Sequence, residues 1–191
     1  MMEIVLASAS PRRLELMNML GFEDLTVLPA AGEENVDLTQ PPHEIVRQLA
    51  MNKAVEVSLR CGGHPLIVAA DTIVWYNNKV YGKPEDEEDA FRMLRSLSGN
   101  THSVFTGVAV FRDGELDLRS EESRVTFREL SDEEIRGYIA TGEPMDKAGA
   151  YGVQGKGAVF VEHLDGDFFN VMGLPLCTLA QMLKQQGVEV F

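Results

Sequence analysis

The sequence contains few of the residues that build metal sites and disulfides. Its 191 residues include only two cysteines, Cys61 and Cys177, with no CxxC pair, and its four histidines lack the spacing of a zinc site. We therefore expect reduced thiols, no structural zinc and a cytoplasmic location. No run of about 20 apolar residues occurs, so we expect no transmembrane helix and no membrane partner. The first six residues include Glu3 and no basic residue, so we expect no signal peptide.

Positive charge is also scarce. The chain has 17 Lys and Arg against 30 Asp and Glu, which gives a net charge of −13. This balance argues against duplex nucleic acid as a partner, although a local basic pocket could still hold a small anion. The apolar fraction of 45% and the absence of repeats and low-complexity runs are typical of a folded globular chain. We expect residues 1–191 to form a single domain.

Strand-like and helix-like segments alternate along the chain, with several hairpins. The patterns predict strands at 3–7, 66–70, 72–76, 79–81, 102–111, 116–127 and 158–164, and helices at 11–20, 42–59, 86–97, 132–141 and 175–186. Asn77-Asn78 and Asp113-Gly114 are typical of tight turns, and Ser131 with Glu134 forms a capping box. This mixture predicts an α/β fold around a mixed sheet rather than a purely parallel one.

The segment Ser8-Ala-Ser-Pro-Arg-Arg13 places two arginines in the first turn of a predicted helix. Ser10 suits the N-cap and Pro11 suits the first helical position. Cations there oppose the helix dipole at a cost of about 0.3–1 kcal/mol each, and a bound anion would offset that cost. Backbone N–H groups, hydroxyls and guanidinium groups together favour a phosphate site. Alternatively, the arginines are solvated or paired with Glu15 or another carboxylate.

Asp71 follows the predicted buried strand at 66–70 and is expected to end it. A carboxylate at such a strand end can hold Mg²⁺ beside a phosphate, although an aspartate that caps the hairpin fits the pattern as well. Glu33 and Glu34 lie in a predicted loop and either add a carboxylate ligand or remain solvated. Lys53 and Lys83 are of a kind usually found at the surface. Lys83, however, lies in a Gly-Lys-Pro turn that can return to the end of the sheet that carries Asp71.

Glycines at 149, 152, 155 and 157 surround Gln154. Glycine allows close approach of the backbone to a ligand, and the amide of Gln154 offers the donor and acceptor that the edge of a base needs. Ordinary turns would explain the same glycines. The chain contains neither a P-loop motif nor a dinucleotide fingerprint after a strand, so a bound nucleotide would be held in another way.

In order along nearly the whole chain, several segments together resemble the Maf family of nucleoside triphosphate pyrophosphatases. They are Leu6-Ala-Ser-Ala-Ser-Pro-Arg-Arg13, Ala70-Asp-Thr72, Gly82-Lys-Pro84, Leu97-Ser-Gly99 with His102, Thr106-Gly107, Lys147-Ala-Gly-Ala-Tyr-Gly-Val-Gln154 and Gly173-Leu-Pro-Leu176. The resemblance implies an elongated mixed sheet with flanking helices, in two lobes around a central cleft, related to the inosine triphosphate pyrophosphatases. It also implies hydrolysis of a nucleoside triphosphate to the monophosphate and pyrophosphate with Mg²⁺ or Mn²⁺, and it suggests a homodimer.

The same resemblance implies roles for individual residues. Asp71 corresponds to the catalytic acid/base and a metal-associated carboxylate, and Glu34 to a second residue on the metal side. Phosphate-binding roles are implied for Ser8, Arg12, Arg13, Lys53 and Lys83.

The late glycine-rich segment resembles that of the dTTP/UTP subgroup, whose specificity positions correspond to Arg12, Thr72 and Gln154. Two alternatives remain open at this point. One is a pyrophosphatase for 7-methyl-GTP or another modified nucleotide. The other is a regulator of septum formation and cell division in which catalysis is secondary.

Overall fold

A long mixed sheet lies at the centre of the fold in the computed structural model, which describes residues 3–32 and 35–191. Its strands follow the order β2-β1-β3-β5-β6-β7, and β4 pairs with β3. β1 is parallel to β2 and β3, and the other pairs are antiparallel. The strands are β1 (Ile4–Leu6), β2 (Thr26–Val27), β3 (Leu66–Tyr76), β4 (Lys79–Tyr81), β5 (Thr101–Arg112), β6 (Glu115–Phe127) and β7 (Val161–Asp165).

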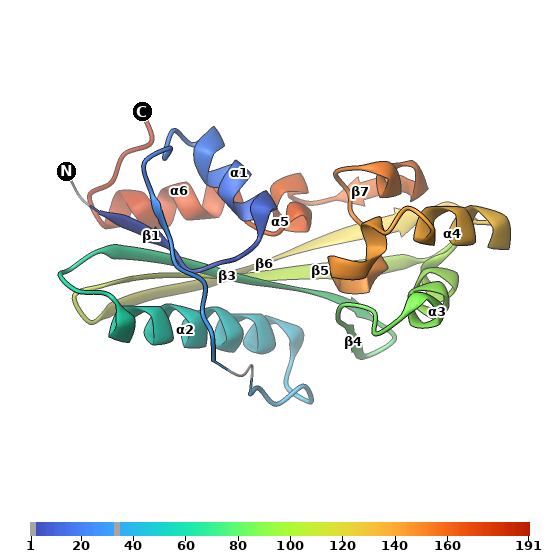
Figure 1. The fold of residues 1–191 in the computed structure, drawn as a ribbon, viewed down its shortest axis with the longest axis horizontal. Coiled ribbons are helices and arrows are strands. Elements are labelled where there is room, and N and C mark those ends of the chain that lie inside the picture. Colours follow the sequence, from blue (N-terminus) through green and yellow to red (C-terminus); the bar gives the residue numbers. More distant parts are fainter. Residues whose placement is uncertain (1–2, 33–34) are drawn as a thin grey trace.

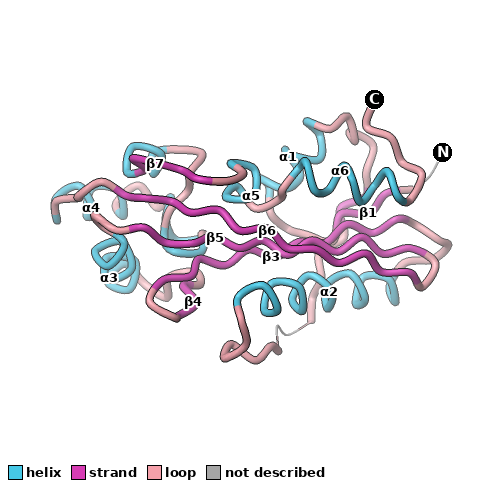
Figure 2. Tube along the Cα trace, turned by 180° about the vertical axis from the view of Figure 1, so that it is seen from behind, coloured by secondary structure: helices cyan, strands magenta, loops and turns pink. Residues whose placement is uncertain are grey.

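Helices cover the sheet differently at its two ends (Figure 1). At one end, a long helix lies on one face and shorter helices lie on the other, whereas the remaining helices and the 3₁₀ turns gather at the far end (Figure 2). The long helix is α2 (Pro42–Arg60), and the three opposite it are α1 (Pro11–Met19), α5 (Phe168–Met172) and α6 (Leu176–Gln185). The far end holds α3 (Glu87–Leu97), α4 (Asp132–Ile139), η1 (Glu143–Asp146), η2 (Ala148–Ala150) and η3 (Lys156–Phe160). No described helix is long and apolar enough to cross a membrane.

Separate apolar cores stabilise the two ends. Leu6, Leu16 and Leu179 belong to the core beneath α1 and α6. Leu94 and Phe127 belong to the core beneath α3 and α4. Because β3 and β5 run through both regions, the two lobes share their strands. The predicted elongated α/β fold with two lobes is confirmed.

Helix α2 packs unusually close to the sheet at Gly107 of β5. A Cβ atom built on Gly107 would lie 2.1 Å from the carbonyl oxygen of Val46 in α2. Only glycine, which has no Cβ, avoids this clash. The close approach lays α2 along β3 and β5, and it brings Lys53 of α2 into contact with Asp71 of β3.

Local sequence signals are confirmed at three places. Asn77 and Asn78 have φ of 50° and 57° in the two-residue turn from β3 to β4, as a type I′ hairpin requires. Asp113 and Gly114 join β5 to β6 in the same way. Ser131 forms the predicted capping box at the start of α4.

Other sequence predictions were wrong. Asp71 does not end its strand, because pairing with β5 continues from Ile67 to Trp75. The predicted strand at 158–164 is η3 as far as Phe160, and β7 occupies Val161–Asp165. Helix α5 and strand β2 were not predicted, since each is too short to show a period. Ser10 takes the N-cap position of α1, but its side chain makes no cap hydrogen bond.

Candidate active site

An interrupted sheet edge creates the site. On one side of β3, β1 pairs only as far as Val68, and β4 begins to pair at Val74. Among the described residues, no strand pairs with the intervening residues 69–73 on that side. Asp71 lies in the middle of this gap. The gap opens into a cleft of about 750 Å³ between the two lobes.

Asp71 and Thr72 leave β3 on opposite faces, as neighbouring strand residues do. Asp71 forms an ion pair with Lys53 of α2, and the two side chains are only 12% and 18% exposed. Thr72 contacts Arg13 of α1 on the other face. The cleft thus extends past the edge of β3, and side chains from both faces of the sheet line it.

A chain of hydrogen bonds fixes Thr72. Nη2 of Arg13 donates to the Thr72 hydroxyl at 3.1 Å, and the two threonine hydroxyls of Thr72 and Thr106 lie 2.8 Å apart. Thr106 donates to the carbonyl of Asn170, so the proton between the two threonines comes from Thr72. The Thr72 hydroxyl thus donates to Thr106 and accepts from Arg13, and it positions Arg13.

Arg13 joins three segments through its guanidinium group. Besides Thr72, it donates from Nε to the carbonyl of Gly173 at 2.8 Å and from Nη1 to the Ser8 hydroxyl at 3.2 Å. The buried Ser8 oxygen also accepts from the amide of Ser10 at 3.2 Å. With two hydrogen bonds accepted, the remaining hydrogen-bonding capacity of Ser8 is its own O–H, which suits a phosphate oxygen.

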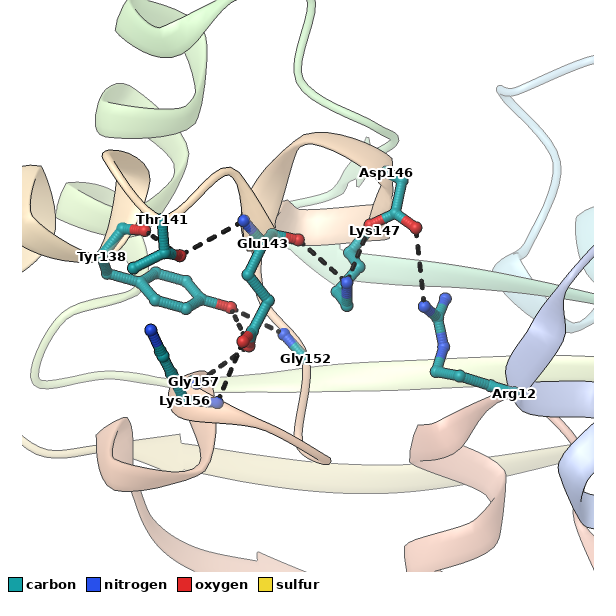
Figure 3. Close-up of polar contacts among 9 residues, drawn as sticks. All are labelled: Arg12, Tyr138, Thr141, Glu143, Asp146, Lys147, Gly152, Lys156 and Gly157. Carbon is teal, nitrogen blue, oxygen red and sulfur yellow. Dashed lines mark hydrogen bonds and ion pairs between the residues drawn. The ribbon is translucent and has the colours of Figure 1, made fainter.

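Arg12 lies across the cleft from η1, where it meets Asp146 (Figure 3). The Arg12–Asp146 ion pair is long, at 3.9 Å, whereas Nζ of Lys147 lies 2.7 Å from the other carboxylate oxygen of Asp146. The hydrogen bond from Lys147, with the charge of Arg12, holds the pKa of Asp146 below its usual value. Lys147 passes so close to Gly152 that a Cβ there would lie 2.8 Å from Cε of the lysine.

A second carboxylate, Glu143, anchors the glycine-rich segment (Figure 3). It accepts from the Tyr138 hydroxyl at 2.9 Å and from the amides of Lys156 and Gly157 at 3.1 Å each. The same tyrosine oxygen accepts from the amide of Gly152 at 3.1 Å. Partial burial opposes ionisation of Glu143, but these hydrogen bonds outweigh it and lower the pKa of the carboxyl.

All eight predicted site residues that the structure describes line this one cleft. They are Ser8, Arg12, Arg13, Lys53, Asp71, Thr72, Lys83 and Gln154. The remaining predicted residue, Glu34, and its neighbour Glu33 lie outside the described residues. Among the described residues, with Lys147 included, five cationic side chains and two carboxylates line the cleft, in a protein of net charge −13.

Sequence reasoning missed Asp146, Glu143 and Tyr138. Asp146 opens the segment that resembles the dTTP/UTP subgroup, which is a signal that could have given it a role. The roles of Glu143 and Tyr138 rest on contacts with residues 152–157, for which the sequence carries no signal. Of the carboxylates that the alternative allowed, Arg12 pairs with Asp146, whereas Glu15 accepts a hydrogen bond from Gln154.

Comparison with known proteins shows which family the chain belongs to. A family model described as Maf-like protein matches residues 3–186. The chain belongs to the Maf-like protein family. This Maf-like chain is 44% identical over 190 residues to the dTTP/UTP pyrophosphatase of Bacillus cereus, covering 100% of this chain and 98% of that protein. It is 44% identical over 191 residues to the dTTP/UTP pyrophosphatase of Clostridium perfringens, covering 99% of this chain and 100% of that protein.

A solved structure shares the fold of this Maf-like protein at low sequence identity. It is a HAM1 protein from Coxiella burnetii, with a TM-score of 0.56 and 17% identity, covering 97% of this chain and 100% of that chain. The likeness supports the architecture of the long mixed sheet, and it extends over both lobes.

Proposed function

We propose that this protein hydrolyses dTTP and UTP to the nucleoside monophosphate and pyrophosphate. Its family and the relatives from Bacillus cereus and Clostridium perfringens, both named dTTP/UTP pyrophosphatase, support this activity. The observation that carries the proposal is the position of Asp71, at an open strand edge inside a cleft lined by cationic side chains. That arrangement suits a triphosphate that is attacked by water beside a carboxylate.

Three groups are placed to bind the phosphates. The ion pair of Arg12 with Asp146 is long, and no other described residue pairs with Arg12, so a phosphate can compete for its guanidinium group. Lys83 forms no hydrogen bond or ion pair with a described residue. Ser8 offers its O–H. In this proposal Arg13 holds Ser8 and Thr72 in place and adds positive charge, rather than serving as the main phosphate ligand.

Asp71 accepts the proton of the attacking water in the proposed reaction. The water oxygen forms a bond to the α-phosphorus, the bond from that phosphorus to the bridging oxygen breaks, and pyrophosphate leaves. Lys53 orients the Asp71 carboxylate through their ion pair. Cationic side chains near the leaving pyrophosphate stabilise its growing charge.

A divalent cation fits the donor set if substrate supplies most of its ligands. The described residues contain no group of three His, Cys, Asp or Glu side chains that could hold a metal by themselves. Mg²⁺, however, is commonly held by one or two carboxylates together with phosphate oxygens and water. We propose that Asp71 is such a carboxylate, and that Glu34 is a second one. Bound Mg²⁺ or Mn²⁺ would neutralise charge on the phosphates.

The proposal includes a cytoplasmic location, where nucleotide substrates occur and where the free thiols Cys61 and Cys177 stay reduced. A homodimer and a part in cell division remain predictions from the family resemblance.

Release of pyrophosphate tests the proposal directly. The substrates are dTTP, UTP, CTP, dCTP, GTP, ATP, ITP and 7-methyl-GTP, each with Mg²⁺, with Mn²⁺ and with EDTA. We expect metal-dependent turnover concentrated on dTTP and UTP. Turnover confined to purine or modified nucleotides would contradict the substrate, and no turnover at all would contradict the enzymatic function.

Replacing Asp71 tests the proposed base. Asp71→Asn is expected to lower kcat for UTP by about 10²–10⁴-fold, the usual contribution of a general base, while the protein still folds. Asp24→Asn, at an exposed loop position, is the matched control and should keep full activity. Near-normal turnover in Asp71→Asn would refute the assignment.

A further inference from the structure

The backbone on both sides of Gln154 is held in place. Before it, the amide of Gly152 donates to the Tyr138 hydroxyl. After it, the amides of residues 156 and 157 donate to the carboxylate of Glu143, which also binds Tyr138 (Figure 3). A Cβ at Gly157 would lie 2.7 Å from the carbonyl oxygen of Gly152, so the two sides of this loop touch. The loop therefore presents Gln154 to the cleft from a fixed position.

The side-chain amide of Gln154 is held as well. Its Nε2 donates to Oε1 of Glu15 at 2.9 Å, a contact between the glycine-rich segment and α1 that spans 139 positions. A carboxylate only accepts hydrogen bonds, so the nitrogen rather than the oxygen of the amide must face Glu15. No described residue donates to the Gln154 side-chain oxygen, and Gln154 lines the cleft. Glu15 thus leaves an acceptor for a ligand.

A defined amide orientation distinguishes pyrimidine bases. Uracil and thymine carry a hydrogen-bond donor at N3 next to carbonyl acceptors. Cytosine carries an acceptor at N3 next to an amino donor. A glutamine amide that rotates freely by 180° exchanges its donor with its acceptor and can pair with either base. An amide held in one orientation cannot.

We propose that Glu15 is a positioning residue for base specificity, which holds the Gln154 amide so that its oxygen accepts from the N3–H group of uracil or thymine. Cytosine nucleotides are then rejected because two acceptors would face each other. Glu15 needs no contact with the substrate for this role. The inference rests on the proposed function and adds to it the residue that excludes cytosine.

Replacing Glu15 by glutamine tests the idea with almost no change in shape. In Glu15→Gln the side chain at 15 can donate or accept, so it no longer dictates the orientation of Gln154. We expect the ratio of kcat/KM for UTP to that for CTP to fall about three- to tenfold, the value of one neutral hydrogen bond, mainly through a gain on CTP. The melting temperature should not change. Glu23→Gln, which removes the same charge at an exposed position outside the cleft, should leave the ratio unchanged.

A second variant separates orientation from structural damage. In the double variant Glu15→Gln with Gln154→Glu, the carboxylate at 154 only accepts, so the preference for UTP over CTP should return at lower turnover. A wild-type protein that releases pyrophosphate from UTP and CTP equally would overturn the inference, as would an unchanged ratio in Glu15→Gln. A wild-type protein that releases none from UTP would instead overturn the proposed function.

Discussion

Removing the carboxylate of Glu143 should destabilise the protein and loosen the glycine-rich segment. Glu143 accepts three hydrogen bonds, from Tyr138 and from the amides of Lys156 and Gly157. In Glu143→Ala the amide of Gly157 and the hydroxyl of Tyr138 lose this partner in a region that is largely buried. The amide of Lys156 is exposed and regains a hydrogen bond from water.

The magnitude follows from these partners. A hydrogen bond to a charged group contributes about 1.5–3 kcal/mol, and such contributions within one network are not additive. With one of the three partners rehydrated, we expect a loss of about 2–4 kcal/mol of unfolding free energy. For a chain of this size that corresponds to a melting temperature lower by about 4–16 °C. KM for UTP should rise, because the loop that carries Gln154 is no longer fixed.

Urea and thermal unfolding between pH 3.5 and 8 measure this effect. Because folding lowers the pKa of Glu143, its contribution is present above the ordinary value of 4.5 and is lost as pH falls through the lower folded value. The stability difference between wild type and Glu143→Ala should therefore be constant from pH 5.5 to pH 8 and shrink in stronger acid. The same truncation at the exposed Glu162 should change stability by less than about 0.5 kcal/mol. An equally small loss at Glu143 would refute the anchoring role.

Two further perturbations probe the scaffold. Gly107→Ala forces a Cβ against the backbone of α2 and should lower the unfolding free energy by about 1–3 kcal/mol or more, measured in urea. Gly137→Ala, which has open space in α4, should instead raise it by about 0.5–1 kcal/mol. Equal effects of the two substitutions would contradict the close packing at Gly107. Burial lowers the pKa of His102 from 6.5 to about 4. As pH falls, the unfolded chain therefore takes up a proton at this histidine before the folded chain does. The unfolding free energy should fall by up to about 3 kcal/mol between pH 6.5 and pH 4. His102→Phe should flatten that part of the stability profile, and an unchanged slope would show that other groups cause it.

Much of the local structure could be predicted from the sequence. The turn at Asn77-Asn78 and the capping box at Ser131 depend on residues within a few positions of each other, so short patterns encode them. Short elements without a period, such as α5 and β2, gave no such pattern. The strand end predicted at Asp71 was wrong for a different reason. A single polar residue in an apolar run resembles a strand end, although the strand continues because β5 pairs along its whole length.

Much of the candidate site was also predicted, through the family resemblance rather than through spacing. Eight of the predicted residues do line one cleft. What the resemblance did not supply is how these residues are held. Arg13 binds Ser8, Thr72 and the carbonyl of Gly173, the last of them 160 positions away. This network makes Arg13 a supporting residue as much as a ligand.

By itself the sequence determined the α/β class, the turns, the helix starts and the family, because these depend on composition, short-range backbone preferences and ordered motifs. Only the tertiary structure decided where β1 and β4 stop along β3, and so where the sheet edge opens at Asp71. It alone joined Gln154 to Glu15 across 139 positions. Such contacts arise when the sheet and its helices pack together, and no pattern local to either residue encodes the partner that packing brings to it.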